Sequence, residues 1–151
     1  MHHYLLRTMV FGPRVIEDYF NRIPKEKWDT PTAEDRFTPR EVVSHLRFWE
    51  PIARGRIDQA MYNSGSDVSN WDEERHAVDE DYASKDPHQM LAEWKDERAE
   101  TWELLQTVPD DAWDNYVIHG MWGNITLDDL ANLLIAHDMY HIEQFREFTA
   151  G

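Results

Sequence analysis

Residues 127–148 constrain the fold of this chain more than any other stretch, because their apolar side chains recur at every third or fourth position. This spacing places them on one face of an α-helix. Thr126 and Asp129 match the pattern of a capping box, so the helix is predicted to begin there. Its inward face carries Leu127, Leu130, Leu134, His137, His141, Gln144 or Phe145, and Phe148.

The clearest start signal belongs to an earlier helix, which begins in the stretch FTPRE. Thr38 is the predicted N-cap, Pro39 takes the first helical position, and Glu41 completes a capping box. Pro51 lies inside this helix and is expected to bend or break it near residues 48–49, because proline cannot donate a backbone hydrogen bond. The inward face carries Val42, His45, Leu46, Trp49, Ile52 and Ala53.

Two further stretches have helical spacing. The first covers much of residues 3–22, where Pro13 is expected to kink or restart the helix. The other begins at Asp86 and Pro87, again a cap followed by a proline. Its inward face carries Leu91, Trp94, Arg98, Thr101 and Leu105.

No stretch shows sustained two-residue alternation, so the chain is predicted to be an all-α four-helix bundle forming a single domain over residues 1–151. Residues 63–85 are acidic and lack a clear period. We interpret them as a long crossover connection between the second and third helices, with a short helix around residues 71–76. Residues 113–124, rich in aromatics and glycine, are predicted to be an ordered loop.

The composition narrows the classes of function. There are 15 basic and 30 acidic residues, and the formal charge of −15 argues against a nucleic-acid partner. No run approaches the roughly 18 apolar residues of a membrane span, and the N-terminus lacks a signal peptide, so a cytoplasmic protein is the default expectation. The chain has no cysteine, which excludes disulfides and zinc–thiolate sites.

Two histidines interrupt the apolar face of the last helix. His137 and His141 are four residues apart, so both imidazoles lie on the same face and could bind one metal. His45 lies on the inward face of another helix. Three neutral imidazoles buried together would be costly without partners, and a divalent ion would supply one. Zinc, nickel and iron all suit such ligands. The alternative is a pair of hydrogen-bonded or surface histidines.

Three other polar residues have two readings each. Asp138 either orients a ligand or is a solvated helix residue. Gln144 either faces the same cavity or lies on the helix surface, and we favour the surface. Arg98 either binds an anionic substrate group or pairs with an acidic side chain such as Glu50, and we favour the pair. The catalytic residues themselves stay unassigned.

The remaining histidines and the tryptophans receive weaker interpretations. His119 could reach the rim of the site, although a loop histidine is more often incidental. His76 and His88 are expected to be exposed. Three tryptophans either line a pocket or belong to the core, and we favour the core: Trp49, Trp94 and Trp122.

The stretches FTPREVVSHLRFWE and WGNITLDDLANLLIAHDMYHIEQ resemble the DinB/YfiT-like metal-binding four-helix bundles. Their order and separation are similar to that family over nearly the whole chain. The resemblance implies an unusual bundle topology, a homodimer, and a metal held by His45, His137 and His141. It also implies a thiol as a possible partner, since some relatives are thiol-dependent transferases or isomerases.

Three functions follow from these observations. The first is a metal-dependent enzyme, a transferase or hydrolase, in which the ion activates a water, a thiol or a carbonyl of a small-molecule substrate. In the hydrolytic version Asp138 would accept the proton. The second is a non-catalytic bundle that binds metal or a small molecule as a sensor or sequestering protein. The third is a structural dimer whose histidines bind no metal.

Overall fold

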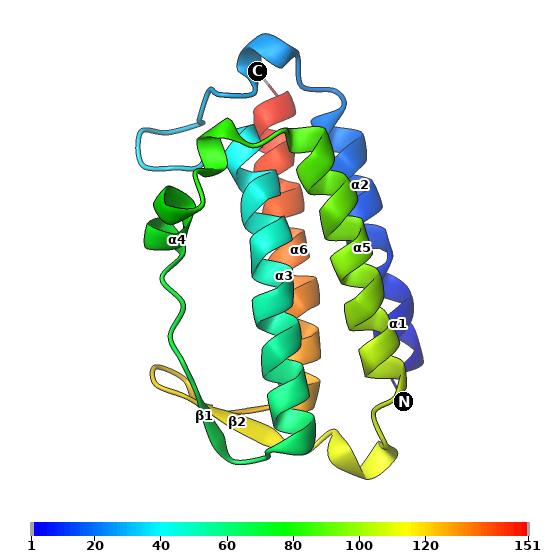
Figure 1. The fold of residues 1–151 in the computed structure, drawn as a ribbon. Helices are drawn as coiled ribbons and strands as arrows, with labels where there is room; N and C mark the ends of the chain where they lie inside the picture. Colours follow the sequence, from blue (N-terminus) through cyan, green and yellow to red (C-terminus); the bar gives the residue numbers. More distant parts are fainter. Residues whose placement is uncertain (1, 151) are drawn as a thin grey trace.

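The computed structural model describes residues 2–150, which form a mostly helical protein built around a bundle of long helices (Figure 1). The bundle contains α1 (His3–Met9) and α2 (Phe11–Phe20), followed by α3 (Pro39–Tyr62), α5 (Pro87–Gln106) and α6 (Leu127–Thr149). The shorter helical elements are η1 (Lys25–Lys27), α4 (Glu73–Asp79), η2 (Tyr82–Ser84) and η3 (Asp110–Ala112). 

The predicted start signals of the long helices are confirmed. The Thr38 hydroxyl accepts a hydrogen bond from the Glu41 N–H, and the Glu41 carboxylate accepts one from the Thr38 N–H. Thr126 and Asp129 make the same reciprocal pair at the start of α6. These bonds satisfy N–H groups that lack partners in the first helical turn. The local sequence therefore fixes where α3 and α6 begin.

The two internal prolines behave differently. The first helical stretch is divided at Val10, and Pro13 lies in the first turn of α2, where its missing N–H has no consequence. The break expected near residues 48–49 is wrong, because α3 continues through Pro51 to Tyr62. Proline removes one helical hydrogen bond, whereas Leu46, Ala53 and their buried neighbours hold both halves of α3 in the core.

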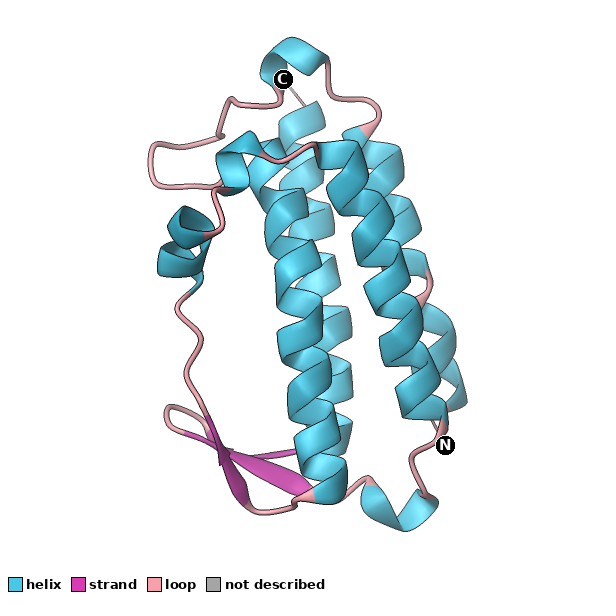
Figure 2. Ribbon diagram, in the orientation of Figure 1, coloured by secondary structure: helices cyan, strands magenta, loops and turns pink. Residues whose placement is uncertain are grey.

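A small sheet corrects the prediction of an all-α fold (Figure 2). β2 (Tyr116–His119) and β3 (Gly123–Thr126) form an antiparallel hairpin in the stretch predicted to be a loop, and β1 (Ser66–Val68) pairs in parallel with β2. Strands of three or four residues are too short to show a clear alternation.

The segment between α3 and α5 contains β1, α4 and η2. In Figure 1, α3 and α5 both run from the end of the bundle near the C-terminus toward the opposite end, and α6 runs the other way. Residues 63–86 therefore return along the outside of the bundle before α5 begins. 

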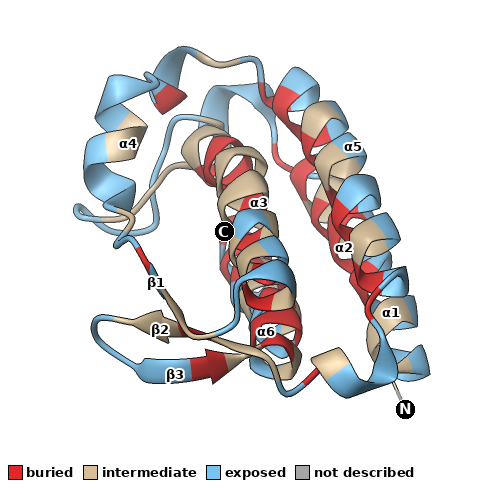
Figure 3. Ribbon diagram, turned by 60° about the horizontal axis from the view of Figure 1, so that its bottom comes forward, coloured by how far each residue is buried: buried red, intermediate tan, exposed pale blue. Residues whose placement is uncertain are grey.

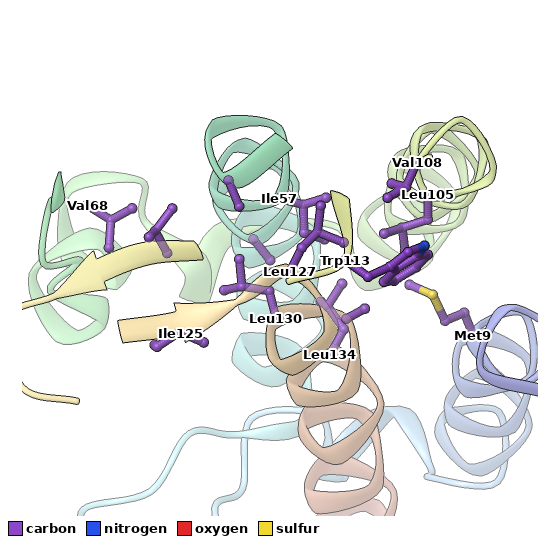
Figure 4. Close-up of a cluster of buried hydrophobic side chains, with 14 residues drawn as sticks. Met9, Ile57, Val68, Leu105, Val108, Trp113, Ile125, Leu127, Leu130 and Leu134 are labelled. Carbon is purple, nitrogen blue, oxygen red and sulfur yellow. The ribbon is translucent and has the colours of Figure 1, made fainter. Parts of the chain in front are cut away.

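Two apolar clusters form the core, and the inward helix faces that build them are buried (Figure 3). One cluster joins the hairpin to the adjoining helix ends and includes Trp113, Ile125 and Leu134 (Figure 4). The other is centred on Trp94 and Phe145. Between these clusters, α3, α5 and α6 each carry buried polar residues, which are His45, Glu50, Arg98, Thr101, Asp138, His141 and Gln144.

Candidate metal centre

Three histidines from two helices converge in this polar layer. His45 comes from α3, and His137 and His141 come from α6. The Nε2 atom of His137 lies 3.0 Å from Nε2 of His45 and 3.1 Å from Nε2 of His141. One ring nitrogen from each residue lies within 4.8 Å of the others. The structure thus brings together the three residues that the sequence singled out.

Gln144 determines which nitrogen of His141 faces this cluster. Its side-chain oxygen lies 2.9 Å from Nδ1 of His141, and both residues are buried. Because that oxygen only accepts hydrogen bonds, Nδ1 carries the proton and the lone pair of the neutral ring is on Nε2. The surface position favoured for Gln144 is wrong: three residues after His141, it lies on the same buried face of α6.

The other two histidines keep one unsatisfied nitrogen each. Nδ1 of His45 and Nδ1 of His137 are buried without a hydrogen-bond partner among the described residues. The Glu73 carboxylate of α4 lies 3.9 Å from Nδ1 of His45, which is too long for a hydrogen bond. Glu73 nevertheless provides a negative charge on the side of His45 that faces away from the cluster.

Burial keeps these imidazoles neutral. It lowers the pKa of His45 to about 3, with further contributions from His141 and His76. Burial also lowers the pKa of His141 to about 4, although the hydrogen bond to Gln144 opposes the shift. The pKa of His137 is lowered well below its ordinary value, again chiefly by burial. At neutral pH all three rings therefore have a free lone pair, which a metal ligand requires.

The spacing of the nitrogens suits a small divalent cation. Zinc–nitrogen bonds of about 2.0–2.1 Å in a tetrahedral site place the nitrogens roughly 3.3–3.4 Å apart. Two of the three observed separations, 3.0 and 3.1 Å, are close to this value, and the third, between His45 and His141, is within 4.8 Å. Three nitrogen ligands leave one tetrahedral position open, which is typical of catalytic zinc sites.

Arg98 and Asp138 belong to a separate buried ion cluster. The Arg98 guanidinium donates to both carboxylate oxygens of Glu50 and to both of Asp138, and also to the Met9 carbonyl. Burial alone would lower the pKa of Arg98, but the two carboxylates raise it above its ordinary range. The interpretation favoured for Arg98, a pair with an acidic side chain such as Glu50, is therefore confirmed.

The structure contradicts one of the two interpretations of Asp138. Asp138 is 3% exposed, so it is not a solvated helix residue, and both of its oxygens bind Arg98 rather than an imidazole. The role of proton acceptor suggested for Asp138 stays a prediction. One residue of helical rotation separates it from the face that His137 presents to the cluster.

An apolar cavity of about 250 Å³ opens beside His137. It lies between α3, the hairpin and α6, and Trp49, Trp122, Ile125 and Leu134 contribute apolar walls. Arg56 also lines it. Trp122 thus lines a pocket and is exposed, whereas Trp49 lines the pocket and also packs against the first apolar cluster, and Trp94 is fully buried.

The remaining histidines lie outside the cluster. His119 is on β2, stacks on Trp122, and accepts hydrogen bonds from the hairpin turn through Nδ1. His88 is exposed, as expected. His76 is not: it is half-buried, and its Nδ1 lies 2.8 Å from the Tyr82 hydroxyl, because α4 folds back against the bundle.

Sequence reasoning missed three residues near the site. Trp71 and Glu73 belong to the acidic connection, where no periodicity marks an inward face; the Trp71 ring centre lies 5.8 Å from that of His45. Arg56 lies eleven positions after His45 on α3, three helical turns along a similar face. That spacing was the available signal for Arg56.

The chain is thus a mostly helical bundle in which three clustered histidines could hold a metal ion. The model of the DinB superfamily matches residues 9–145, and the chain belongs to that superfamily. No curated protein sequence matches the chain significantly. Among the described residues, no helix is both long and apolar enough to cross a membrane.

Solved structures share the fold. YfiT from Bacillus subtilis, described as a probable metal-dependent hydrolase with an unusual four-helix bundle topology, superposes with a TM-score of 0.91 at 21% identity, over 97% of this chain and 85% of that one. The DinB-like protein YjoA from Bacillus subtilis has a TM-score of 0.68 at 14% identity, over 98% and 90%.

A mycothiol-dependent maleylpyruvate isomerase also has this fold. Its TM-score is 0.78 at 10% identity, and the match covers 96% of this chain. The chain spans 60% of the length of the isomerase. At these identities the similarities define the fold.

Proposed function

We propose that the chain is a metal-dependent enzyme that acts on a small molecule, with a divalent cation held by His45, His137 and His141. The observation that carries this proposal is the convergence of three Nε2 atoms in a buried layer. Neutral imidazoles with facing lone pairs repel one another unless a proton or a cation lies between them. A shared cation satisfies all three.

The chain's own residues prepare the site for such an ion. Gln144 fixes the tautomer of His141, and the short helical step between His137 and His141 fixes their relative position. Trp49 and Trp71 contact the histidine rings and limit the access of water. The chemistry that a bound divalent cation supplies is Lewis-acid activation of a water, a thiol or a carbonyl group.

The adjacent cavity favours an enzyme over a protein that only stores metal. Because His137 lines both the cluster and the apolar cavity, a molecule in the cavity would lie next to the proposed ion. The proposed reaction is hydrolysis, by analogy with the description of YfiT. A thiol-dependent transfer is the second candidate, and the fold shared with a mycothiol-dependent isomerase favours it.

We also propose that residues 63–85 act as the crossover connection of the bundle and cover the site. This segment supplies Trp71 and Glu73, which lie beside His45. 

Metal analysis tests the proposal. Protein expressed with zinc, nickel and iron available should retain close to one ion per chain, whereas His45→Ala and His141→Ala should each lose most of it. His88→Ala, which removes an exposed histidine, is the matched control and should retain the ion. Equal metal content in all four proteins, or none in the wild type, would contradict the proposal.

Activity assays then separate an enzyme from a binding protein. Loaded wild type should hydrolyse small esters or amides, or join low-molecular-weight thiols to electrophiles, and His141→Ala should not. Stoichiometric metal without turnover in either screen would favour the sensor or sequestering protein instead.

A further inference from the structure

Arg56 differs from the other buried or half-buried arginines among residues 2–150. Each of those arginines lies within 4.0 Å of a carboxylate, as seen for Arg36, Arg40, Arg47, Arg54 and Arg98. Arg56 is half-buried and has no carboxylate partner in the described chain; one of its terminal nitrogens donates to the Ser69 carbonyl at 3.2 Å. 

This arrangement is unusual for a chain with twice as many acidic as basic residues. A partly desolvated guanidinium is costly without a counter-ion, and burial indeed lowers the pKa of Arg56 from its ordinary value. Arginine keeps its charge nonetheless. The remaining donors of Arg56 are therefore available to a ligand.

The cavity places Arg56 and the histidine cluster in one binding space. No acidic residue lines this cavity, so Arg56 provides its only formal charge. The indole of Trp49 lies beside both Arg56 and His137. Its ring centre is 5.1 Å from the guanidinium carbon of Arg56 and 5.7 Å from the ring centre of His137. The indole of Trp49 thus lies between the Arg56 guanidinium and the histidine cluster.

We infer that Arg56 binds the anionic group of the substrate, and that the substrate joins a carboxylate-type or sulfonate-type anion to an apolar body. The guanidinium fork matches the paired oxygens of such groups. Trp49, Trp122 and Ile125 would contact the apolar body, and the reacting bond would then lie toward His137. The inferred orientation of the reacting bond rests on the proposed function, whereas anion binding does not.

Binding of matched probes tests this inference. Phenylacetate, benzenesulfonate and the neutral phenylacetamide are titrated into zinc-loaded protein, with the fluorescence of the tryptophans in the cavity as the signal. The wild type should bind at least one of the two anions about tenfold or more tightly than the amide, the scale expected for charge-assisted hydrogen bonds. Arg56→Met should bind all three alike.

Two variants serve as controls. Arg56→Lys keeps the charge without the fork and should retain part of the preference. Arg54→Met removes a charge from the same helix, at a residue paired with Glu97, and should behave as the wild type. If Arg56→Met fails to fold, Arg56→Gln allows the same comparison. A preference that persists in Arg56→Met, or is absent from the wild type, would overturn the inference.

The titrations are repeated after removal of metal with a chelator. A preference that survives chelation and depends on Arg56 supports the inference, even if the protein proves to bind no metal and the proposed function fails. A preference that chelation abolishes would place the anion on the ion and overturn the assignment to Arg56. Metal content, measured in the same samples, keeps the two failures distinct.

Discussion

The geometry of the site depends on the choice of nitrogen in each imidazole. In His141 the hydrogen bond from Nδ1 to Gln144 leaves Nε2 as the free acceptor. Partners of this kind typically change metal affinity by about 10- to 100-fold. Gln144 is therefore the residue whose loss should weaken binding without removing a ligand.

Replacing Gln144 by leucine should lower zinc affinity by about 10- to 100-fold, because His141 loses the acceptor that fixes its tautomer. Competition with a chromophoric chelator measures this change. Gln144→Glu keeps an acceptor at the same place and should bind within a few-fold of the wild type. If the leucine variant binds zinc as tightly as the wild type, the hydrogen bond does not position His141.

The lowered histidine pKa values predict a loss of stability in mild acid for the metal-free protein. Unfolding restores the ordinary pKa of 6.5, so the unfolded chain binds more protons below that pH. The stabilisation is complete above pH 6.5 and is lost progressively as the pH falls toward about 4 for His141 and 3 for His45. At pH 5 each of these two residues should lower the free energy of unfolding of the metal-free protein by about 2 kcal/mol.

Urea unfolding between pH 7.5 and 5 measures this loss. The variant His45→Gln removes one titrating group, so its comparison with the wild type separates His45 from the carboxylates that titrate at lower pH. The pH dependence of its free energy of unfolding should be smaller than that of the wild type by close to one proton. An identical pH dependence in the wild type and in His45→Gln would show that His45 is not buried in its neutral form.

Not all residues of the site were equally predictable. The helical register alone selects three histidines, because an imidazole on an otherwise apolar helix face departs from the pattern. These are His45, His137 and His141. The surface position predicted for Gln144 is wrong because polar residues beside that face are usually solvated, and the same pattern leaves the burial of Asp138 open. Only the folded structure reveals that Arg98 of α5 binds both oxygens of Asp138 of α6.

At the scale of the elements, the Arg98 cluster joins three helices. Glu50 of α3 and Asp138 of α6 both bind Arg98 of α5. The cluster lies between the two apolar clusters, so it contributes to the relative position of α3 and α6, on which the histidines depend.

Replacing Arg98 by methionine should lower the free energy of unfolding by about 3–5 kcal/mol, since it leaves two buried carboxylates without a partner. Urea denaturation measures this loss. Arg75→Met breaks an exposed pair and should leave stability unchanged within error. A small loss for Arg98→Met would mean that water reaches the cluster.

The contact of α2 with α6 requires a glycine. A Cβ on Gly12 would overlap the Asp138 carboxylate, which Arg98 holds in place. Gly12→Ala should therefore cost about 1–3 kcal/mol. Gly55→Ala is the matched control on α3, where the added methyl meets open space, and it should stabilise by about 0.5–1 kcal/mol. Thermal unfolding of both variants distinguishes the two outcomes; equal effects would contradict this packing.

The long helices were predictable because capping boxes and periodicity are local. The hairpin was not predictable because its strands are short, and the pairing of β2 with β1 joins residues some fifty positions apart. The break expected near residues 48–49 is absent because buried side chains on both sides of Pro51 outweigh one missing hydrogen bond.

At the scale of the whole molecule, the site is assembled from segments distant in sequence. The ligands come from α3 and α6, the connection supplies Trp71 and Glu73, and the hairpin contributes a wall of the cavity. Sequence patterns identify the helices, but they do not place an irregular segment against them. The predicted homodimer stays a prediction, which light scattering in solution would test.

In the proposed site, one divalent ion is bound by three imidazoles. X-ray absorption at the zinc edge, on protein loaded with one equivalent of zinc, tests it most directly. We expect three imidazole nitrogens at about 2.0–2.1 Å from the zinc, and fewer in His141→Ala. A zinc shell of oxygen ligands without imidazole scattering, or a spectrum unchanged by that substitution, would contradict it.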